Sequence, residues 1–296
     1  MVHSPNRRAL LLATTAAPFA FAFEARPARA SPSAAIRSEL ATLEQASGGR
    51  LGICALDTAN GADIHYRADE RFPFCSTFKL ILAAAVLAQS VKASNLMEQR
   101  IRYGQGDMVT YSPATAEHIA DGMTVTELCR ATVELSDNTA ANLLMKMLGG
   151  PSAVTAYARS IGDREFHLDR WETALNTAIP GDRRDTSTPA AMAQTVRSLA
   201  LGNALPTAQR QALQTWLRGC RTGANRIRAG VPSGWEVGDK TGTGDYGTAN
   251  DVAVLWPPSR KPIVLAIYHT QRSADAKARE DVIAAAARIV ADALGH

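Results

Sequence analysis

The sequence predicts an α/β protein of the two-lobe, α+β kind: one antiparallel sheet built from both chain ends with flanking helices, plus an inserted all-helical lobe. Two observations lead to this fold class. Strand-like patterns occur over residues 50–68 and again over residues 235–270, whereas helical patterns and helix caps fill the chain between them. A sheet shared by both ends leaves the middle of the chain to form a layer of its own. We therefore expect a sheet lobe of residues 31–70 and 219–296 and a helical lobe of residues 71–218.

The first thirty residues have the features of an export signal rather than of a folded element. Arg7 and Arg8 precede a 15-residue apolar run, and Ala28-Arg29-Ala30 is a small-residue cleavage site. The paired arginines favour twin-arginine export, although a general secretory signal would look similar. Because the run is too short to span a bilayer comfortably, we expect cleavage near Ala30 and a soluble exported protein. An uncleaved membrane anchor is the alternative.

Charge and composition argue against a nucleic-acid partner and against a metal. Residues 1–30 carry four arginines and one glutamate, so the formal net charge falls from +4 to +1 when they are removed. No basic patch remains to suit nucleic acid. The histidines are scattered, without a pair such as H-E-x-x-H, so we expect neither a metal site nor a cofactor. The remaining chain is long enough for two lobes with sizeable cores.

The four cysteines are Cys54, Cys75, Cys129 and Cys220. No two of them form a C-x-x-C motif, which argues against zinc-ribbon and thioredoxin-like readings. An export compartment permits disulfides, but a core of this size does not need them. Because free cysteine is among the most buried residue types, we expect buried free thiols.

Alternation and turn residues predict the strands. A helix over Ser33–Ala46 precedes the alternating run Arg50–Thr58, and Asn60-Gly61 is a hairpin signal before a return strand. After the helical block, we expect strands around Trp235–Val237, Asp251–Trp256 and Pro262–Thr270. An amphipathic helix over Ala274–Leu294 is expected to end the chain.

The helical block begins with Ser76, which precedes a run that is apolar nearly all round and therefore predicts a buried helix. Thr124-x-x-Glu127 is a capping box, and Thr188-Pro189 is an N-cap followed by proline at the first helical position. Helices are expected over residues 124–134, 139–148, 152–161 and 189–201, and one more after Pro206. The long non-helical stretch is His167–Asp185, and loops of that length are usually functional.

Ser76 and Lys79 are the first candidates for chemistry. They lie one turn apart on the same helix face, and no acidic residue lies three or four positions from Lys79. The ammonium group must therefore find distant partners or have its pKa lowered by burial. A serine beside such a lysine is one way to activate a hydroxyl without histidine. In the structural alternative, Ser76 only caps the helix and Lys79 extends to solvent.

Three further features fall at the edges of the predicted elements. Ser136-Asp137-Asn138 lies between two helices, Lys240-Thr241-Gly242 lies on the first strand after the helical block, and Glu172 with Asn176 lies in the long loop. Taken singly they suit a helix cap, an edge lysine beside a turn, and a solvated carboxylate. Ser-Asp-Asn and Lys-Thr-Gly both follow a Ser-x-x-Lys that lies at a helix start. Each tripeptide is rare at average residue usage, so this combination is very unlikely to arise by chance.

This combination is the signature of class A β-lactamases and penicillin-binding proteins. Along essentially the whole mature length, the chain resembles class A serine β-lactamases, and most of all the chromosomal broad-spectrum penicillinases of Gram-negative bacteria. The resemblance implies the serine β-lactamase/penicillin-binding-protein-like fold, a periplasmic location, and hydrolysis of penicillins and cephalosporins that gives antibiotic resistance. It implies small-molecule β-lactam substrates and inhibitors as partners, with no cofactor, nucleic acid or membrane. We expect a monomer, since no long apolar surface stripe suggests an interface.

The resemblance also assigns roles to individual residues. Ser76 matches the nucleophile, Lys79 the lysine that helps to activate it, and Ser136 the hydroxyl that passes a proton to the lactam nitrogen. Glu172 and Asn176 match the pair that holds the hydrolytic water. The backbone N–H groups of Ser76 and Thr243 would form the oxyanion hole. The positions that match substrate-binding residues are Asn138, Lys240, Thr241, Thr243, Tyr111 and Arg226, and those that match the ion pair at the ends of the long loop are Arg170 and Asp185.

Some positions depart from the family pattern. Some relatives join a cysteine at the position of Cys75 to one where this chain has Gly244, and others pair the equivalent of Cys129 with a position that is alanine here, so neither disulfide is expected. Thr173 follows Glu172 where many relatives carry proline, which leaves the geometry of that peptide bond open. Thr243 and Asp245 lie where relatives differ in their handling of cephalosporins and carbapenems, which hints at a broad spectrum.

Two other functions share part of the motif set. A D,D-carboxypeptidase or transpeptidase would use Ser76, Lys79, Ser136 and Lys240 but gives no account of the glutamate in the long loop. A β-lactam sensor would stay acylated and would carry membrane segments. Hydrolysis needs a base that holds water against the acyl-enzyme, whereas a transpeptidase must exclude that water. Glu172 is therefore the residue that decides between these functions.

Overall fold

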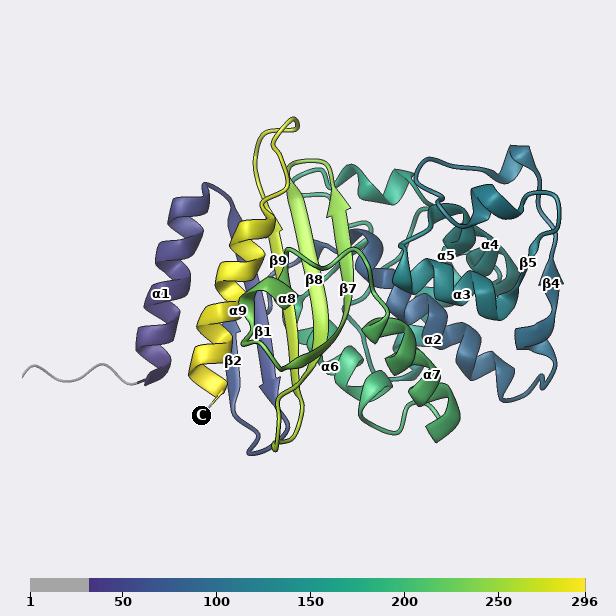
Figure 1. Cartoon of the computed structure of the whole chain (residues 1–296). Coiled ribbons are helices and arrows are strands. Elements are labelled where there is room, and N and C mark those ends of the chain that lie inside the picture. Colours follow the sequence, from purple (N-terminus) through teal and green to yellow (C-terminus); the bar gives the residue numbers. More distant parts are fainter. Residues whose placement is uncertain (1–31, 296) are drawn as a thin grey trace, which may run out of the picture.

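The computed structural model describes residues 32–295 (Figure 1). The signal peptide predicted for residues 1–30, with its cleavage near Ala30, lies outside the described residues. In Figure 1 the sheet stands between two helical layers. One layer is the pair α1 (Pro32–Ser47) and α9 (Glu280–Leu294), and the other is the larger group of helices formed by the middle of the chain.

The sheet joins both ends of the chain, as predicted. Its strand order is β2-β1-β9-β8-β7, and every neighbouring pair is antiparallel. The strands are β1 (Arg50–Asp57), β2 (Asp63–Tyr66), β7 (Glu236–Gly244), β8 (Thr248–Trp256) and β9 (Ile263–Thr270). β1 pairs with β9, so the N-terminal hairpin and the C-terminal strands form one continuous sheet. β7 is an edge strand, and it faces the helical lobe with its free edge.

The two faces of the sheet belong to two hydrophobic clusters. Alternate residues of β1 such as Leu51 and Ile53 pack with Ile267 of β9 against α1 and α9. The opposite face, which includes Val252 and Tyr268, belongs to a second cluster that continues into the helical lobe. The predicted alternation of Leu51, Ile53 and Ala55 on one face is confirmed.

The middle of the chain forms the predicted helices. They are α2 (Lys79–Ser90), α3 (Val125–Glu134), α4 (Asn138–Leu148), α5 (Pro151–Ser160), α6 (Pro189–Ala200) and α7 (Thr207–Arg218). The short α8 (Ile227–Gly230), which was not predicted, follows before β7 and packs against α9. α2 contacts α3, α4, α5 and α7 and is buried along nearly its whole length, which explains why its sequence is apolar all round. α6 covers the inner face of the sheet, where it contacts β1, β8 and β9.

The capping signals form as the sequence indicates. Thr124 accepts a hydrogen bond from the Glu127 N–H, and the Glu127 carboxylate accepts one from the Thr124 N–H, which completes the capping box of α3. Thr188 caps α6 by accepting from the Ala191 N–H. These caps place the helix starts within a residue or two of the predicted positions.

Two features differ from the sequence expectation. The last helix begins at Glu280 rather than Ala274, because Ser273 bonds to Asp275 and Gln271 to the Lys277 carbonyl in a turn that competes with helix formation. The inserted block is not purely helical. It carries the short ladders β3 (Phe72–Pro73) with β6 (Thr186–Ser187) and β4 (Arg100–Ile101) with β5 (Met123–Thr124), and the 3-10 turns η1 (Cys75–Phe78), η2 (Leu96–Glu98), η3 (Gln105–Asp107), η4 (Thr115–His118) and η5 (Ala174–Thr177).

All four cysteines are free and buried, as predicted. Burial raises the pKa of Cys54 to about 12 and that of Cys220 to about 11, and it raises the pKa values of Cys75 and Cys129 as well. These thiols therefore remain protonated at neutral pH and pack as small apolar groups.

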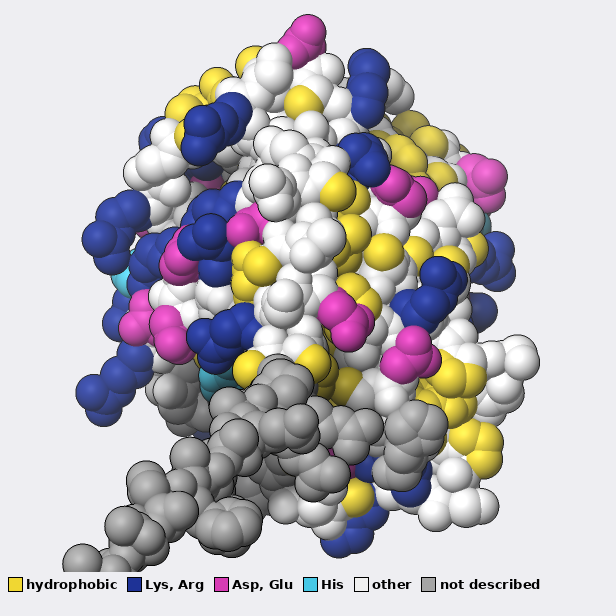
Figure 2. All heavy atoms as spheres, turned by 90° about the vertical axis from the view of Figure 1, so that its left-hand side faces the viewer, with side chains coloured by type: hydrophobic (Ala, Val, Ile, Leu, Met, Phe, Trp, Pro, Cys, Tyr) yellow, Lys and Arg dark blue, Asp and Glu magenta, His cyan; other side chains and the backbone are white. Residues whose placement is uncertain are grey.

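The surface on the side of α1 and α9 carries mixed charges. Figure 2 shows basic and acidic side chains interspersed there, with hydrophobic side chains scattered between them. Within residues 32–295, no helix combines the length and the apolar character needed to cross a membrane.

Candidate active site

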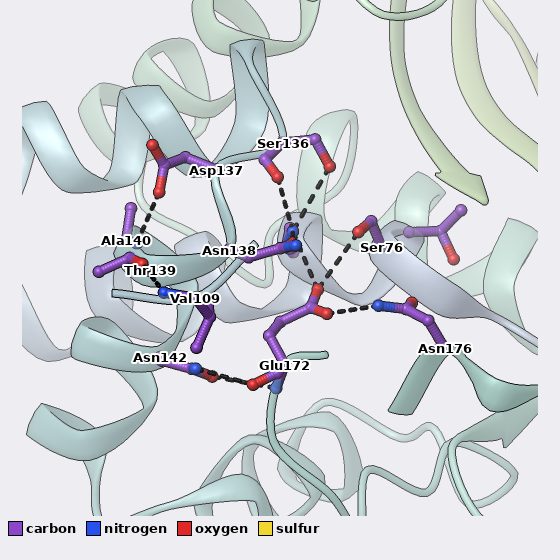
Figure 3. A network of polar contacts seen from close by, with 12 residues as sticks. Ser76, Val109, Ser136, Asp137, Asn138, Thr139, Ala140, Asn142, Glu172 and Asn176 are labelled. Atoms are coloured by element: carbon purple, nitrogen blue, oxygen red, sulfur yellow. Dashed lines mark hydrogen bonds and ion pairs between the residues drawn. The ribbon is translucent and has the colours of Figure 1, made fainter. Parts of the chain in front are cut away.

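The predicted site residues come from four separate segments. Ser76 and Lys79 lie at η1 and the start of α2, and Ser136 and Asn138 lie just before and at the start of α4. Glu172 and Asn176 lie in the long loop, and Lys240 and Thr243 lie on β7. Figure 3 shows Ser76, Ser136, Asn138, Glu172 and Asn176 pointing toward one another between the helices and the edge of the sheet.

Ser76 is placed by a tight turn that β7 supports directly. Cys75 has a left-handed backbone (φ +47°), and the Phe74 N–H donates to the Asp185 carbonyl at 3.1 Å. A Cβ on Gly242 of β7 would lie 2.6 Å from the Phe74 carbonyl oxygen and 3.2 Å from the Ser76 nitrogen. Only glycine permits this approach, so the strand lies against the turn and presents Ser76 at the junction of the two lobes.

Lys79 is completely buried and fully supplied with polar partners. Its Nζ donates to the Ser136 carbonyl (2.8 Å) and to Asn138 Oδ1 (2.5 Å), and it lies 2.9 Å from Glu172 Oε1. Burial lowers the pKa of this lysine, while the Glu172 carboxylate raises it in part. The ammonium proton is therefore easier to lose here than in water, and the expectation of distant partners or a lowered pKa is met in both respects.

Glu172 connects the lysine to the serine. Its Oε1 accepts a hydrogen bond from Ser76 Oγ at 3.3 Å, and its Oε2 accepts one from Asn176 Nδ2 at 2.6 Å. The backbone of Glu172 is held on both sides by Asn142, whose side chain accepts from the Glu172 N–H and donates to the Glu172 carbonyl. The peptide bond from Glu172 to Thr173, left open by the sequence, is cis.

The long loop is tied down where it ends. Arg170 Nε donates to Asp185 Oδ2 at 2.5 Å, and the other carboxylate oxygen of Asp185 accepts from the N–H groups of Asp169 and Arg170. Directly after Asp185, β6 pairs with β3. The end of the loop is thus fastened to the strand that leads into the Ser76 turn.

Ser136 lies between two buried lysines. Its hydroxyl is 3.4 Å from Lys79 Nζ and accepts a hydrogen bond from Lys240 Nζ at 3.0 Å. Burial chiefly, and the nearby Lys79 charge in addition, lower the pKa of Lys240 to about 8. A hydroxyl that touches two lysines can pass a proton from one side of the site to the other.

Two of the predicted anion-binding residues, Arg226 just before α8 and Thr243 on β7, contact each other beside the sheet. Arg226 is buried, and its guanidinium donates to Thr243 Oγ1 (2.7 Å) and to the carbonyls of Gly242 and Asn250. Its Nε forms an ion pair with Glu280 at 3.0 Å. Thr243 is exposed, and its hydroxyl contacts the buried guanidinium of Arg226.

Two predicted substrate-binding residues contact this cluster through their backbone carbonyls, and the Thr241 carbonyl accepts from Lys240 Nζ at 2.9 Å. The Thr241 side chain is 4% exposed, and its hydroxyl shares a hydrogen bond with Thr222 at 2.5 Å. Tyr111 is 57% exposed, and only its backbone carbonyl meets the cluster, by accepting from the Asn138 N–H. The Tyr111 ring is thus a surface feature and the Thr241 hydroxyl a buried one.

Comparison with known proteins identifies the family. Residues 35–294 match the β-lactamase enzyme family. The β-lactamase OXY-1 of Klebsiella oxytoca is 51% identical over 294 residues, which cover 99% of this chain and all of the relative. A variant of the class A β-lactamase of the last common ancestor of Gram-negative bacteria has a solved structure with a TM-score of 0.86 and 57% identity, covering 88% of this chain and 98% of that one. The chain belongs to the class A β-lactamase family.

A second solved structure supports the same conclusion. The β-lactamase from Desulfarculus baarsii superposes with a TM-score of 0.88 at 59% identity, covering 89% of this chain and 98% of that one. The resemblance stated from the motifs is confirmed, and so is the fold class. This chain is a serine β-lactamase, and enzymes of this class hydrolyse β-lactam antibiotics through an acylated serine and thereby confer resistance.

Sequence reasoning missed several residues of the β-lactamase site. Asn142 holds the Glu172 backbone, and Glu280 pairs with Arg226. Asp137 caps α4, as the cap interpretation of Ser136-Asp137-Asn138 predicted, and it also accepts from the Ala114 and Thr115 N–H groups. Asn142 follows Asn138 by one helical turn, and this spacing is the one signal in the sequence that could have found it. Glu280 lies at the start of a helix, where an acidic residue is ordinary.

Proposed function

We propose that Ser76 of this β-lactamase attacks the β-lactam carbonyl and that Glu172 drives hydrolysis of the resulting acyl-enzyme. The observation that carries the proposal is the position of the Glu172 carboxylate, 3.3 Å from Ser76 Oγ and bonded on its other oxygen to Asn176. A base at hydrogen-bond distance from the acylated oxygen is what a hydrolase needs and a transpeptidase must avoid. The carboxypeptidase and sensor alternatives leave this carboxylate without a role.

Acylation needs a proton acceptor for Ser76 and a proton donor for the lactam nitrogen. Glu172 Oε1 accepts from Ser76 Oγ and also contacts Lys79 Nζ, so the serine proton has a short route to either group. Burial, which lowers the pKa of Lys79, makes its neutral, proton-accepting form easier to reach than in water. Ser136, which touches both Lys79 and Lys240, then passes a proton to the leaving nitrogen as the C–N bond breaks.

The substrate is held by groups on both sides of Ser76. Its carboxylate suits Lys240, Thr243 and Arg226, which supply positive charge and hydrogen-bond donors at one end of the site. Asn138 meets the side-chain amide of the antibiotic, and the exposed Tyr111 ring forms a wall beside it. The N–H groups of Ser76 and Thr243 stabilise the oxyanion that develops in the transition state.

Deacylation uses a water between Glu172 and Asn176. The Asn176 Oδ1 atom is buried and has no partner among residues 32–295, so it is available to accept a hydrogen from that water. Glu172 takes the other proton as the water attacks the ester. The Arg170–Asp185 pair, by fixing the end of the loop, keeps both side chains in place.

The wider role follows from the same proposal. The enzyme acts as a periplasmic monomer on penicillins and cephalosporins, after removal of the N-terminal signal, and it needs no metal or cofactor. The chemistry is complete with the side chains described: a nucleophile, proton carriers, oxyanion donors and a base for water.

Intact-protein mass spectrometry tests the proposal directly. With excess benzylpenicillin, the wild type is expected to return to its free mass while substrate is consumed, Glu172→Ala to accumulate a stable adduct of one penicillin, and Ser76→Ala to show none. Glu134→Ala, which removes a buried carboxylate of α3 that pairs with Arg130, serves as the control and is expected to behave as wild type. A wild type that stays acylated for hours would refute hydrolysis and favour the penicillin-binding or sensor alternative.

A further inference from the structure

Asn250 lies beside the active site and has no role in the mechanism above. It is completely buried on β8, where its backbone pairs in register with Gly242 of β7. Its side-chain Nδ2 donates to the carbonyl oxygens of Pro73 (2.8 Å) and Phe74 (3.1 Å), which are 177 and 176 residues away in the chain. These two carbonyls belong to the residues just before the turn that carries Ser76.

The Ser76 turn needs support of this kind. Phe74 is helical in backbone conformation and Cys75 is left-handed, so the chain reverses within two residues. A buried carbonyl group without a hydrogen-bond donor destabilises the backbone conformation that buries it. The Phe74 carbonyl also accepts from the N–H and hydroxyl of Thr77, whereas the Pro73 carbonyl depends on Asn250 as its side-chain donor among the described residues.

The same residue reaches the other side of the site through its backbone. The Asn250 carbonyl accepts from Arg226 Nη1 at 2.7 Å, and that guanidinium holds Thr243 Oγ1. The register partner of Asn250, Gly242, lies against the Phe74 carbonyl and the Ser76 nitrogen. Asn250 is therefore bonded to the nucleophile turn by its side chain and to the anion-binding group by its main chain.

We propose that Asn250 is a positioning residue for the β-lactamase reaction: its side-chain amide ties the Ser76 turn to β8, the strand that pairs with β7, and so sets the spacing of the Ser76 and Thr243 N–H groups. This inference rests on the proposed roles of those two groups as oxyanion donors. Catalysis is sensitive to such spacing, since a displacement of about 1 Å can lower a rate about 100-fold and loss of an oxyanion donor lowers it about 100- to 1,000-fold.

The test uses Asn250→Leu, which removes both polar functions at similar volume, and Asn250→Asp, which keeps the shape and in its ionised form has no hydrogen to donate. Acylation and deacylation rate constants are measured by quenched-flow mass spectrometry with benzylpenicillin and are expressed per acylatable site, so that unfolded protein does not count. Both variants are expected to show acylation and deacylation slowed by about 10- to 100-fold. Penicillin affinity, measured with Ser76→Ala present in each chain, is expected to change by less than about 3-fold.

Thr248→Val is the matched control. It removes one buried hydroxyl of the same strand, bonded to Thr270 at 3.0 Å, and is expected to lower the melting temperature without slowing acylation. Wild-type rate constants per site in Asn250→Leu or Asn250→Asp would overturn the inference, as would a loss confined to penicillin affinity. Failure of the wild type to form an acyl-enzyme would instead refute the proposed function, so the two failures can be told apart.

Discussion

The two sides of the sheet bury their residues for different purposes. At the lobe junction, Lys79, Glu172 and Lys240 are each 4% exposed or less, and each is held by polar groups from other segments. The layer between the sheet and helices α1 and α9 is equally buried and consists mainly of aliphatic side chains such as Leu51 and Ile267, with His269, Asp57 and Asp251 among its few buried titratable groups.

The contrast separates stability from function. A buried charge is expensive to desolvate and adds little to stability even when it is paired, whereas buried aliphatic side chains each stabilise the fold by about 1.5–3 kcal/mol. The charges at the junction are therefore best explained by the reaction, and the aliphatic layer by the need to hold the sheet on which β7 presents its groups. Variants that affect only one side sharpen this division.

The largest effect on the aliphatic side is expected from Ile267→Ala. Ile267 is completely buried and packs in the cluster beneath α9, so truncation leaves a cavity and lowers the free energy of unfolding by about 2–5 kcal/mol. Because the side chain points away from the lobe junction, kcat/KM per folded molecule is expected to stay within about 2-fold of wild type. Urea unfolding gives the free energy of unfolding, and penicillin kinetics give kcat/KM. Ile267→Val is the milder control, and it is expected to lower the free energy of unfolding by about 0.5–1.5 kcal/mol. A drop of tenfold or more in kcat/KM would show that the two sides are coupled.

A smaller effect on the same side concerns pH. His269 lies on the face toward α1, with one ring nitrogen 3.1 Å from Ser47 Oγ and the other without a partner among residues 32–295. Burial chiefly, and the Arg279 charge in addition, lower the pKa of His269 to about 4 in the folded protein, against 6.5 for the free side chain. The unfolded chain therefore binds a proton first as the pH falls, and stability is lost from pH 6.5 down to about pH 4.

The expected loss over that range is about 2–3 kcal/mol. His269→Gln, which cannot titrate, is expected to lack this part of the pH dependence of the free energy of unfolding. The difference between variant and wild type therefore isolates the contribution of His269 from that of the carboxylates. If the free energies of unfolding of the two proteins fall in parallel between pH 6.5 and 4, His269 is not the group responsible for the loss.

The sequence predicts the secondary structure further than it predicts the contacts of the active site. Period-2 alternation predicted the strands, and the caps at Thr124 and Thr188 predicted helix starts, because these signals are local and their residues act on near neighbours. The start of α9 was placed too early because the side-chain bonds around Ser273 override the helical pattern.

At the site, family motifs named the reactive groups but not their supports. Asn250 and Glu280 contact residues far away in the chain, and nothing in their local sequence distinguishes them from an ordinary strand or helix-start residue. Thr241 was predicted to bind the substrate, and this role depends on the face of the strand to which its side chain points. In the structure the Thr241 hydroxyl bonds to the hydroxyl of Thr222. Such contacts depend on tertiary placement, which local patterns do not encode.

The smallest effect is expected at the outer support of the anion-binding group. Glu280→Gln removes the charge that pairs with Arg226 Nε, and because the Glu280 side chain is 36% exposed, stability should fall by less than about 1 kcal/mol. The Arg226 guanidinium keeps its bonds to two carbonyls and to Thr243, but its acceptor on the Nε side becomes a neutral amide oxygen, which holds it less firmly than a carboxylate does. We expect KM for penicillin to rise by about 3- to 10-fold with kcat nearly unchanged, as for a contact that binds ground state and transition state alike. Asp281→Asn, which makes the same charge change at the same helix start but touches Arg279 instead, should leave KM unaltered. Equal effects of the two variants would trace the change to the α9 terminus rather than to Arg226, and would show that Glu280 does not support the anion-binding group.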